Sequence, residues 1–170
     1  MKKSEQVYLS VGSNLGDRES NLAQAITALG INHDINDVQS SSFYDTEPLY
    51  FTEQGYFLNT VVGCSTKLSP FDFLDVTRHV EQMLGQPKIR EKNMPRIIDI
   101  DILVHGKSVL ETEELTLPHP QLATRRFVLI PFEEIAPNFQ VPVFNSTVRE
   151  LLAYCPDSSY VAMHYMEKEA

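Results

Sequence analysis

Residues 94–106, MPRIIDIDILVHG, place two carboxylates inside a run that otherwise has the composition of a buried β-strand. A strand alternates its faces, so Asp99 and Asp101 point to one side while Ile98, Ile100 and Ile102 point to the other. Two residues of rise separate the two aspartates by roughly 6–7 Å at the backbone. Aspartate is depleted in strands, so two of them on one face need a physical reason.

Two interpretations of this pair remain open: a solvated strand face, or a Mg²⁺ site. Mg²⁺ is held by one or two protein carboxylates together with water and phosphate oxygens. Positive charge gathers nearby in the sequence, at Lys88, Arg90, Lys92, Arg96, Arg125 and Arg126. The chain carries a formal net charge of −9, so these clusters favour a small anionic ligand over a nucleic acid or an anionic membrane surface.

At 170 residues the chain is expected to form one domain, residues 1–170, with a proper hydrophobic core. Its 42% hydrophobic and 22% charged residues are ordinary for a globular protein. No apolar run reaches bilayer-spanning length and the start lacks a signal-peptide core, so we expect a cytoplasmic protein without a membrane segment. Cys64 and Cys155 have no metal-ligand spacing and are expected in the core.

The first half of the chain predicts a strand at 7–11, a helix with Leu22, Ile26 and Leu29 on its apolar side, and two strands. Gly30 is expected to cap that helix at its C-terminus. The two strands fall within INDVQSSSFYDTEPL, residues 35–49, and GYFLNTVVGCSTK, residues 55–67.

A second helix follows at SPFDFLDVTRHVEQMLG, with Ser69 as N-cap, Pro70 in the first turn, Asp72 favouring the helix dipole and Gly85 ending it. Polar residues 86–95 predict a loop before the Asp99 strand. The order β-α-β-β-α-β predicts an α+β, ferredoxin-like core: an antiparallel sheet with both helices on one face. C-terminal additions follow: a hairpin within 106–120, helices within 125–137 and 146–155, and an edge strand or loose tail at 160–166.

Other candidate residues also allow two interpretations. The basic residues before Arg96 form either a solvated loop or a source of positive charge for phosphoryl transfer. His119, between two prolines, is either structural or a phosphate contact. Phe57 and Phe127 are either core residues or the walls of a site for a flat heterocycle whose edge Asn59 would hydrogen-bond. The sequence lacks a Walker A motif, a Rossmann fingerprint, kinase motifs and a nucleophile elbow, so nucleotide chemistry would need another scaffold.

Several motifs together resemble the 6-hydroxymethyl-7,8-dihydropterin pyrophosphokinase family, over nearly the whole chain. They are VYLSVGSNLGDRESNL, SSFYDTEPLY, YFLNTVV, PRIIDIDILVHG and LTLPHPQLATRRFVLIPFEEIAP. The resemblance implies a ferredoxin-like fold and transfer of pyrophosphate from ATP to the pterin alcohol in folate biosynthesis, releasing AMP.

The resemblance also implies roles for individual residues. Asp99 and Asp101 would hold two Mg²⁺ ions on the ATP phosphates, and Arg96 would contact the phosphates or the transferring group. The remaining ATP contacts would come from Arg78, Glu81, the backbone at Ile102, His119 and Arg125. The pterin would be bound by Thr46, Leu49, Phe57, Asn59 and Phe127, its ring stacked between the two phenylalanines.

The chain departs from the family pattern in the loop before Arg96. The family has an arginine soon after the helix-ending glycine and a Trp-Gly before the Pro-Arg, where this chain has Gln86, Asn93 and Met94 and no tryptophan. Lys88 or Arg90 is expected to supply the missing charge, as part of the catalytic group. Because the family enzyme is often a monomer, we expect one here.

Two rival functions follow from these observations. A nucleotide- or pterin-binding module with little or no turnover would be consistent with the altered loop. A ligand- or peptide-binding ferredoxin-like domain would be consistent with the fold alone. Formation of AMP separates the enzyme from both.

Overall fold

The computed structural model describes residues 2–49, 52–88 and 92–166. Six strands of the described chain form the main sheet: β1 (Glu5–Ser13), β2 (Ile35–Ser40), β3 (Tyr44–Thr46), β4 (Phe57–Thr66), β5 (Asp99–His105) and β10 (Val161–Met163). Four helices pack around it: α1 (Arg18–Gly30), α2 (Pro70–Met83), α3 (Arg126–Ile135) and α4 (Val148–Ala153). Smaller elements are β6 (Leu110–Glu111), β7 (Thr116–Leu117), the 3-10 helix at Leu122–Thr124, β8 (Gln140–Val141) and β9 (Ser146–Thr147).

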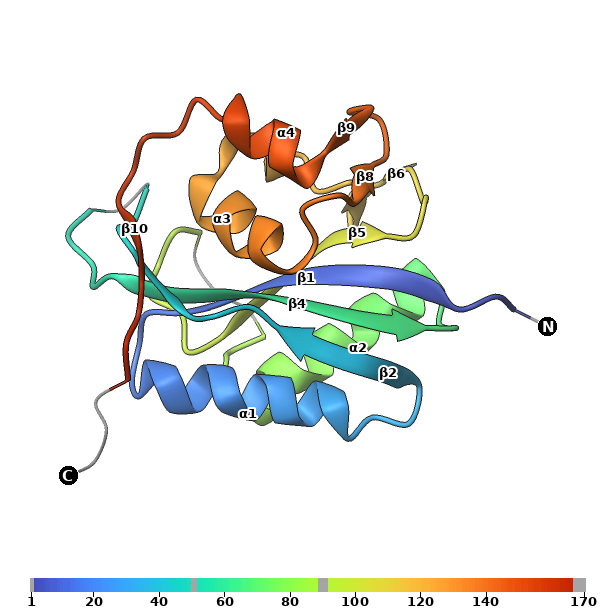
Figure 1. Ribbon diagram of the computed structural model, residues 1–170. Coiled ribbons are helices and arrows are strands. Elements are labelled where there is room, and N and C mark those ends of the chain that lie inside the picture. The colour runs from blue at the N-terminus through green and yellow to red at the C-terminus, as the bar shows by residue number, and fades with distance from the viewer. Residues whose placement is uncertain (1, 50–51, 89–91, 167–170) are drawn as a thin grey trace.

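The sheet is antiparallel, with β1 between β4 and β5. On its other side β4 pairs with both β2 and β3, and β10 adds an edge strand beyond β3. Helices α1 and α2 cover one face, and α3 and α4 lie on the opposite face (Figure 1). The ferredoxin-like α+β fold is therefore confirmed, with α3 and α4 as additions on the face that the core helices leave open.

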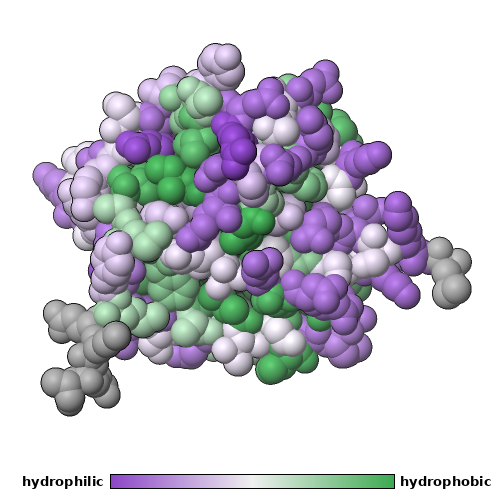
Figure 2. All heavy atoms as spheres, viewed as in Figure 1, coloured by the Kyte–Doolittle hydropathy of each residue, from purple (hydrophilic) through white to green (hydrophobic). Residues whose placement is uncertain are grey.

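Two apolar clusters hold these layers together. The first packs β1, β4 and β5 against α1 and α2, and its Leu9, Leu22 and Phe73 are fully buried. The second packs the other face against α3 and α4, around Leu129 and Phe132. Truncating a fully buried leucine such as Leu9 to alanine would cost about 2–5 kcal/mol of stability. Hydrophobic residues reach the surface in the region of α3 and α4, among hydrophilic ones (Figure 2).

Helix ends follow the local sequence closely in α2. Ser69 Oγ accepts a hydrogen bond from the Asp72 amide at 3.2 Å, Pro70 opens the helix, and Gly85 adopts the left-handed φ of 92° just after the cap. The expectation for α1 was wrong at one residue. Gly30 is the last helical residue, and Ile31 caps the helix with right-handed geometry, its amide donating to Thr27 O. The chain continues without a left-handed turn, so no glycine is needed there.

The single β-tending segment at 35–49 is two strands, β2 and β3, which pair with successive parts of β4. The break is stabilised by Ser41, whose amide donates to Val61 O at 2.9 Å and whose hydroxyl lies 2.9 Å from Thr60 Oγ1. The C-terminal segment forms the edge strand β10. Within the described residues, none of the helices is long and apolar enough to cross a membrane.

Candidate functional site

A cavity of about 430 Å³ lies on the sheet face that α1 and α2 do not cover. Along β1, Val7, Leu9 and Val11 are fully buried in the cluster with α1 and α2. Ser10 and Gly12 alternate with these residues, so they face the other way and line the cavity. The floor of the cavity is therefore the polar part of the sheet.

Asp99 and Asp101 lie on this floor. In the β1–β5 ladder Asp101 pairs with Ser10 and Asp99 pairs with Gly12, and both aspartates line the cavity. Both are partly buried, whereas Ile100 between them is 4% exposed and packs in the core on the other side. The alternation expected from the sequence thus brings two carboxylates to one cavity wall.

Arg96 enters the same cavity from the loop before β5. Its backbone is fixed by Asn14: the Arg96 amide donates to Asn14 Oδ1 at 2.7 Å, and the Asn14 amide donates to Arg96 O at 3.0 Å. The guanidinium Nε donates to Met94 O at 3.0 Å. Asn14 also donates to Gln54 Oε1 at 2.7 Å, which joins a third loop to this corner of the cavity.

His119 and Arg125 complete the basic side of the cavity. The His119 amide donates to Leu103 O at 2.8 Å, and its Nδ1 accepts from the Gln121 amide at 3.1 Å. Burial, together with the Arg125 charge and against the attraction of Asp99, lowers the pKa of His119 to about 4. The ring is therefore neutral near pH 7, with its proton on Nε2. Arg125 donates a hydrogen bond to Gln121 Oε1, and its guanidinium carbon Cζ lies over the Phe127 ring, 5.5 Å from the ring centroid.

A second part of the lining, next to the basic side, is aromatic and amide-lined. Thr46 and Phe57 pair across the β3–β4 ladder, and Phe127 on α3 lines the same cavity. Asn59 Nδ2 donates to Thr46 Oγ1 at 2.6 Å, and both residues are buried. Leu49 also contributes to this wall. Two aromatic rings and a fixed amide suit a flat heterocycle with polar edges.

The structure thus gathers ten of the predicted site residues in one cavity: Arg96, Asp99, Asp101, His119, Arg125, Thr46, Leu49, Phe57, Asn59 and Phe127. Four others lie outside its described lining. Arg78 and Lys88 are exposed, Glu81 is buried on α2, and the Ile102 side chain packs in the core. Arg90 lies outside the described residues.

Sequence reasoning missed several lining residues. Ser10 and Gly12 could have been found from the alternation VYLSVG, because they share a face on a strand next to the acidic one. Gln54 carries no local signal that would have marked it as cavity-lining. Lys92 belongs to the basic cluster noted in the sequence, but no individual role was expected for it. Gln86, which stands where the family has its loop arginine, is buried, and its Oε1 accepts from the Ile97 amide at 2.8 Å. This hydrogen bond holds the loop against the start of β5, and the neutral Gln86 side chain contributes no charge.

The donor set of the cavity fits Mg²⁺. Two aspartates on one wall supply hard oxygen ligands, and the basic side chains that line the same cavity suit the phosphate oxygens of a nucleotide. In the part of the chain that the structure describes, no group of three or more His, Cys, Asp or Glu side chains is placed to hold a metal alone. A site of this kind therefore needs ligand oxygens to complete it, which is the usual arrangement for Mg²⁺ bound with a nucleotide.

Comparison with known proteins agrees with this geometry. A model of the 7,8-dihydro-6-hydroxymethylpterin-pyrophosphokinase (HPPK) family matches residues 8–137. The 2-amino-4-hydroxy-6-hydroxymethyldihydropteridine pyrophosphokinase of Bacillus subtilis is 41% identical over 129 residues, 75% of this chain and 76% of the relative. The enzyme of the same name from Methylorubrum extorquens is 40% identical over 149 residues, 87% of this chain and 92% of the relative.

Longer proteins contain a similar unit. The folic acid synthesis protein FOL1 of Dictyostelium discoideum is 36% identical over 91% of this chain, which spans only 23% of that relative. The solved structure of Plasmodium falciparum HPPK-DHPS A437G with STZ-DHP has a TM-score of 0.68 and 16% identity. The match covers 89% of this chain and 45% of that one, and supports the fold. From its family match and its relatives, this chain belongs to the 7,8-dihydro-6-hydroxymethylpterin-pyrophosphokinase family.

Proposed function

We propose that this protein is a Mg²⁺-dependent enzyme that transfers pyrophosphate from ATP to 6-hydroxymethyl-7,8-dihydropterin in folate biosynthesis. One observation carries the proposal: a single cavity is lined by two aspartates and three basic side chains and, next to them, by two phenylalanines and an asparagine amide whose orientation is fixed. A polyphosphate and a flat heterocycle can therefore lie next to each other. The family and the names of its relatives support the same activity.

In the proposed reaction the hydroxymethyl oxygen of the pterin attacks the β-phosphorus of ATP. A new O–P bond forms, the bond from the β-phosphorus to the oxygen shared with the α-phosphate breaks, AMP leaves, and the hydroxyl proton passes to solvent. Positioning and electrostatic stabilisation account for most of the catalysis in phosphoryl transfer. Arg96, Arg125 and Lys92 are placed to neutralise charge on the phosphate oxygens.

His119 has a different role. Because its pKa is lowered to about 4, the ring is neutral and its Nε2–H is available as a hydrogen-bond donor to a phosphate or ribose oxygen. A neutral donor adds direction without adding a charge beside Arg125. At the other end, Phe57 and Phe127 would stack on the pterin while Asn59 reads its edge.

Asp99 and Asp101 would hold Mg²⁺, and we expect two ions when ATP is bound. Bound there, the metal would supply positive charge to the phosphate oxygens of ATP. The two carboxylates would fix the position of the metal charge, because they lie on β5. This strand pairs with β1 and follows the loop that carries Arg96. We further propose that the protein acts as a monomer in the cytoplasm, as the resemblance to the family and the lack of an apolar segment of bilayer-spanning length in the sequence suggest.

The test is AMP formation by the purified protein from ATP and 6-hydroxymethyl-7,8-dihydropterin. We expect AMP and the pterin diphosphate in equal amounts, loss of activity with a chelator, and recovery on adding Mg²⁺. ATP alone, and the pterin lacking its 6-hydroxymethyl group, serve as controls. If both ligands bind and no AMP forms with Mg²⁺ present, the chain is a binding module and the proposal is wrong.

A further inference from the structure

The C-terminal segment, residues 157–164, lies beyond the residues that the family model matches and folds back across the elements that build the cavity. At its start, the Arg126 amide donates to Asp157 Oδ2 at 2.9 Å, one residue from Arg125. In the middle, the Tyr160 amide donates to Glu47 Oε1 at 2.7 Å. Glu47 lines the cavity, so this segment contacts both of its sides.

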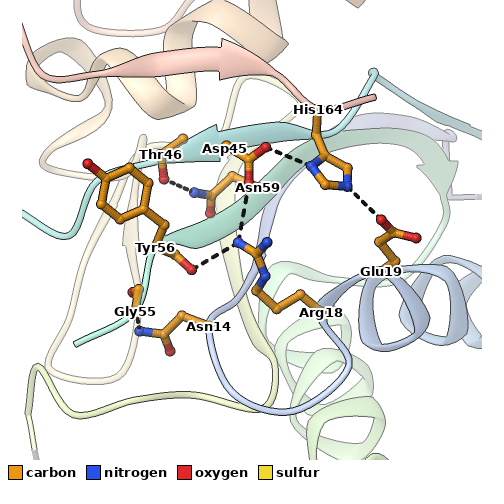
Figure 3. Close-up of polar contacts among 9 residues, drawn as sticks. All are labelled: Asn14, Arg18, Glu19, Asp45, Thr46, Gly55, Tyr56, Asn59 and His164. Atoms are coloured by element: carbon orange, nitrogen blue, oxygen red, sulfur yellow. Dashed lines mark hydrogen bonds and ion pairs between the residues drawn. The ribbon is translucent and has the colours of Figure 1, made fainter. Parts of the chain in front are cut away.

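Strand β10 then pairs with β3, placing Ala162 opposite Asp45, and the segment ends at His164. The His164 amide donates to Phe43 O at 2.8 Å, which extends the pairing by one residue. The His164 ring lies between β3 and α1, as Figure 3 shows. One histidine therefore joins the C-terminal segment to two separate elements of the core.

Both nitrogens of this ring face carboxylates. Nδ1 lies 2.6 Å from Asp45 Oδ2, and Nε2 lies 2.6 Å from Glu19 Oε1. An ionised carboxylate only accepts hydrogen bonds, so both contacts form together only when both nitrogens carry a proton. A neutral ring would point a lone pair at one of the carboxylates. The geometry thus selects the imidazolium.

The charges around His164 balance in that form. The charged groups that the described structure places against it are Glu19 and Asp45, with Arg18 on the far side of Asp45. Arg18 Nη1 lies 3.3 Å from Asp45 Oδ1 and donates to Tyr56 O at 3.1 Å. The two cations, Arg18 and doubly protonated His164, then balance the two anions, Asp45 and Glu19. The hydrogen bond to Glu19 is the largest cause that raises the pKa of His164. Burial opposes it, and the hydrogen bond and charge of Asp45 add to the rise.

This charged network lies directly behind the heterocycle end of the cavity. Asp45 precedes Thr46, which accepts from Asn59, and Tyr56 precedes Phe57. Thr46 and Phe57 are a cross-strand pair, and Arg18 joins their neighbours Asp45 and Tyr56 (Figure 3). Loosening Asp45 would free both the edge of β3 and the start of β4.

We propose that doubly protonated His164 is a positioning residue for the pterin: it clamps Asp45 to Glu19 and so holds Thr46, Phe57 and Asn59 in their binding geometry. This rests on the proposed function. It adds a residue from outside the matched family region and makes pterin affinity depend on pH. As the pH rises through the pKa of His164 the clamp opens, and the KM for the pterin increases. In the part of the chain that the structure describes, the side-chain contacts of His164, Glu19 and Arg18 go to each other, Asp45 and Tyr56 and not to the residues assigned to ATP, so we expect the KM for ATP to stay unaffected.

The test measures KM for each substrate and kcat from about pH 6 to pH 9, for the wild-type protein and His164→Gln. Wild type should show a pterin KM that rises roughly threefold to tenfold across this range, the loss expected for a partly exposed charged contact. His164→Gln should start at the high value and stay flat. The KM for ATP and the kcat should follow wild type. His33→Gln is the matched control, because His33 is exposed, lies beyond the C-terminal end of α1 and pairs with Asp34.

A second variant keeps the test valid if His164→Gln folds poorly. Glu19→Gln removes one of the two carboxylates at a partly exposed site, and should move the rise in pterin KM to lower pH. A titration of the His164 ring by NMR should give a midpoint above the ordinary value of about 6.5 in wild type, and a lower one in Glu19→Gln.

The proposal is wrong if the pterin KM of His164→Gln stays within twofold of wild type at every pH, or if the KM for ATP changes equally. An unshifted midpoint in Glu19→Gln would also overturn it. Failure of the proposed function has a different signature, since wild type itself would then make no AMP. Pterin binding measured by calorimetry at low and high pH would still test the clamp in that case.

Discussion

The side-chain amide of Asn59 donates a 2.6 Å hydrogen bond to Thr46 Oγ1 across the β3–β4 pair. The two residues are 4% and 2% exposed, so water does not compete for this bond. Because Nδ2 is held by the threonine, the orientation of the amide is fixed, and Oδ1 lies over the backbone of Gly12. The pair sets the direction in which Asn59 presents a polar edge to the cavity, and three neighbouring strands share in fixing it.

Replacing Thr46 with valine should raise the KM for the pterin and leave the KM for ATP unchanged. The buried amide of Asn59 loses its acceptor, at a cost of about 1–3 kcal/mol, and is free to turn. Steady-state kinetics with each substrate varied in turn measures this. Thr77→Val is the control, since Thr77 is buried on α2 and bonds to Leu74 O. An equal rise in pterin KM in both variants would mean that stability, and not orientation, is responsible.

Gly12→Ala should weaken pterin binding by the same route. A Cβ at Gly12 would overlap Asn59 Oδ1, so the amide must move, at a typical cost of about 1–3 kcal/mol for added volume. At Gly30 a Cβ would meet nothing within 4 Å, so Gly30→Ala is the matched control and should retain the wild-type pterin KM. Binding calorimetry with the pterin checks both, and unchanged affinity in Gly12→Ala would contradict the assignment of Asn59.

Asp99→Asn and Asp101→Asn should each reduce kcat by about 100-fold or more while the protein remains folded. Each change removes charge that would hold Mg²⁺, and loss of electrostatic stabilisation of this kind is typically worth that much. Neutralising one of two neighbouring like charges should leave the melting temperature near that of wild type. Asp75→Asn, exposed on α2, is the control. Near-wild-type turnover in either variant would show that the metal assignment is wrong.

The loop lysines can be compared directly. Lys92 lines the cavity and Lys88 does not, so Lys92→Met should lower kcat/KM for ATP more than Lys88→Met, by roughly tenfold if it neutralises a phosphate. Lys67→Met, distant from the cavity, provides the baseline. A larger loss at Lys88 would instead support the expectation taken from the family pattern.

Because His119 is neutral in the folded protein, it should make the folded protein less stable in mild acid. Its pKa is about 4 in the folded protein against about 6.5 when unfolded, so between these values the unfolded chain binds more protons. The free energy of unfolding therefore decreases as the pH falls from about 6.5 to 4, by on the order of 1–3 kcal/mol from this residue. Denaturant titrations of wild type and His119→Gln should show the smaller decrease in the variant. Parallel pH dependence would contradict a neutral His119.

Local patterns in the sequence were sufficient to predict most of the helices and strands. Ser69, Pro70 and Gly85 mark the ends of α2 because caps and dipoles act over a few residues, and the ferredoxin-like order follows once the elements are known. The Asp99–Asp101 pair was also recognised locally, because the period of a strand places both on one face. Two local predictions were wrong. Gly30 was expected to cap α1, but the helix is capped by Ile31, and the segment 35–49 was expected to be one strand, but it forms β2 and β3.

The sequence by itself determined which residues alternate, which helices form and which side chains are candidates for the chemistry, because these depend on neighbours along the chain. Only the tertiary structure decided that Ser10 and Gly12 line the same cavity floor as Asp99 and Asp101. It also decided that the buried Gln86 side chain binds the backbone before β5, and that His164 contacts Asp45 and Glu19. Those relationships join residues up to 145 positions apart, and are set by strand register and packing, which no local period encodes.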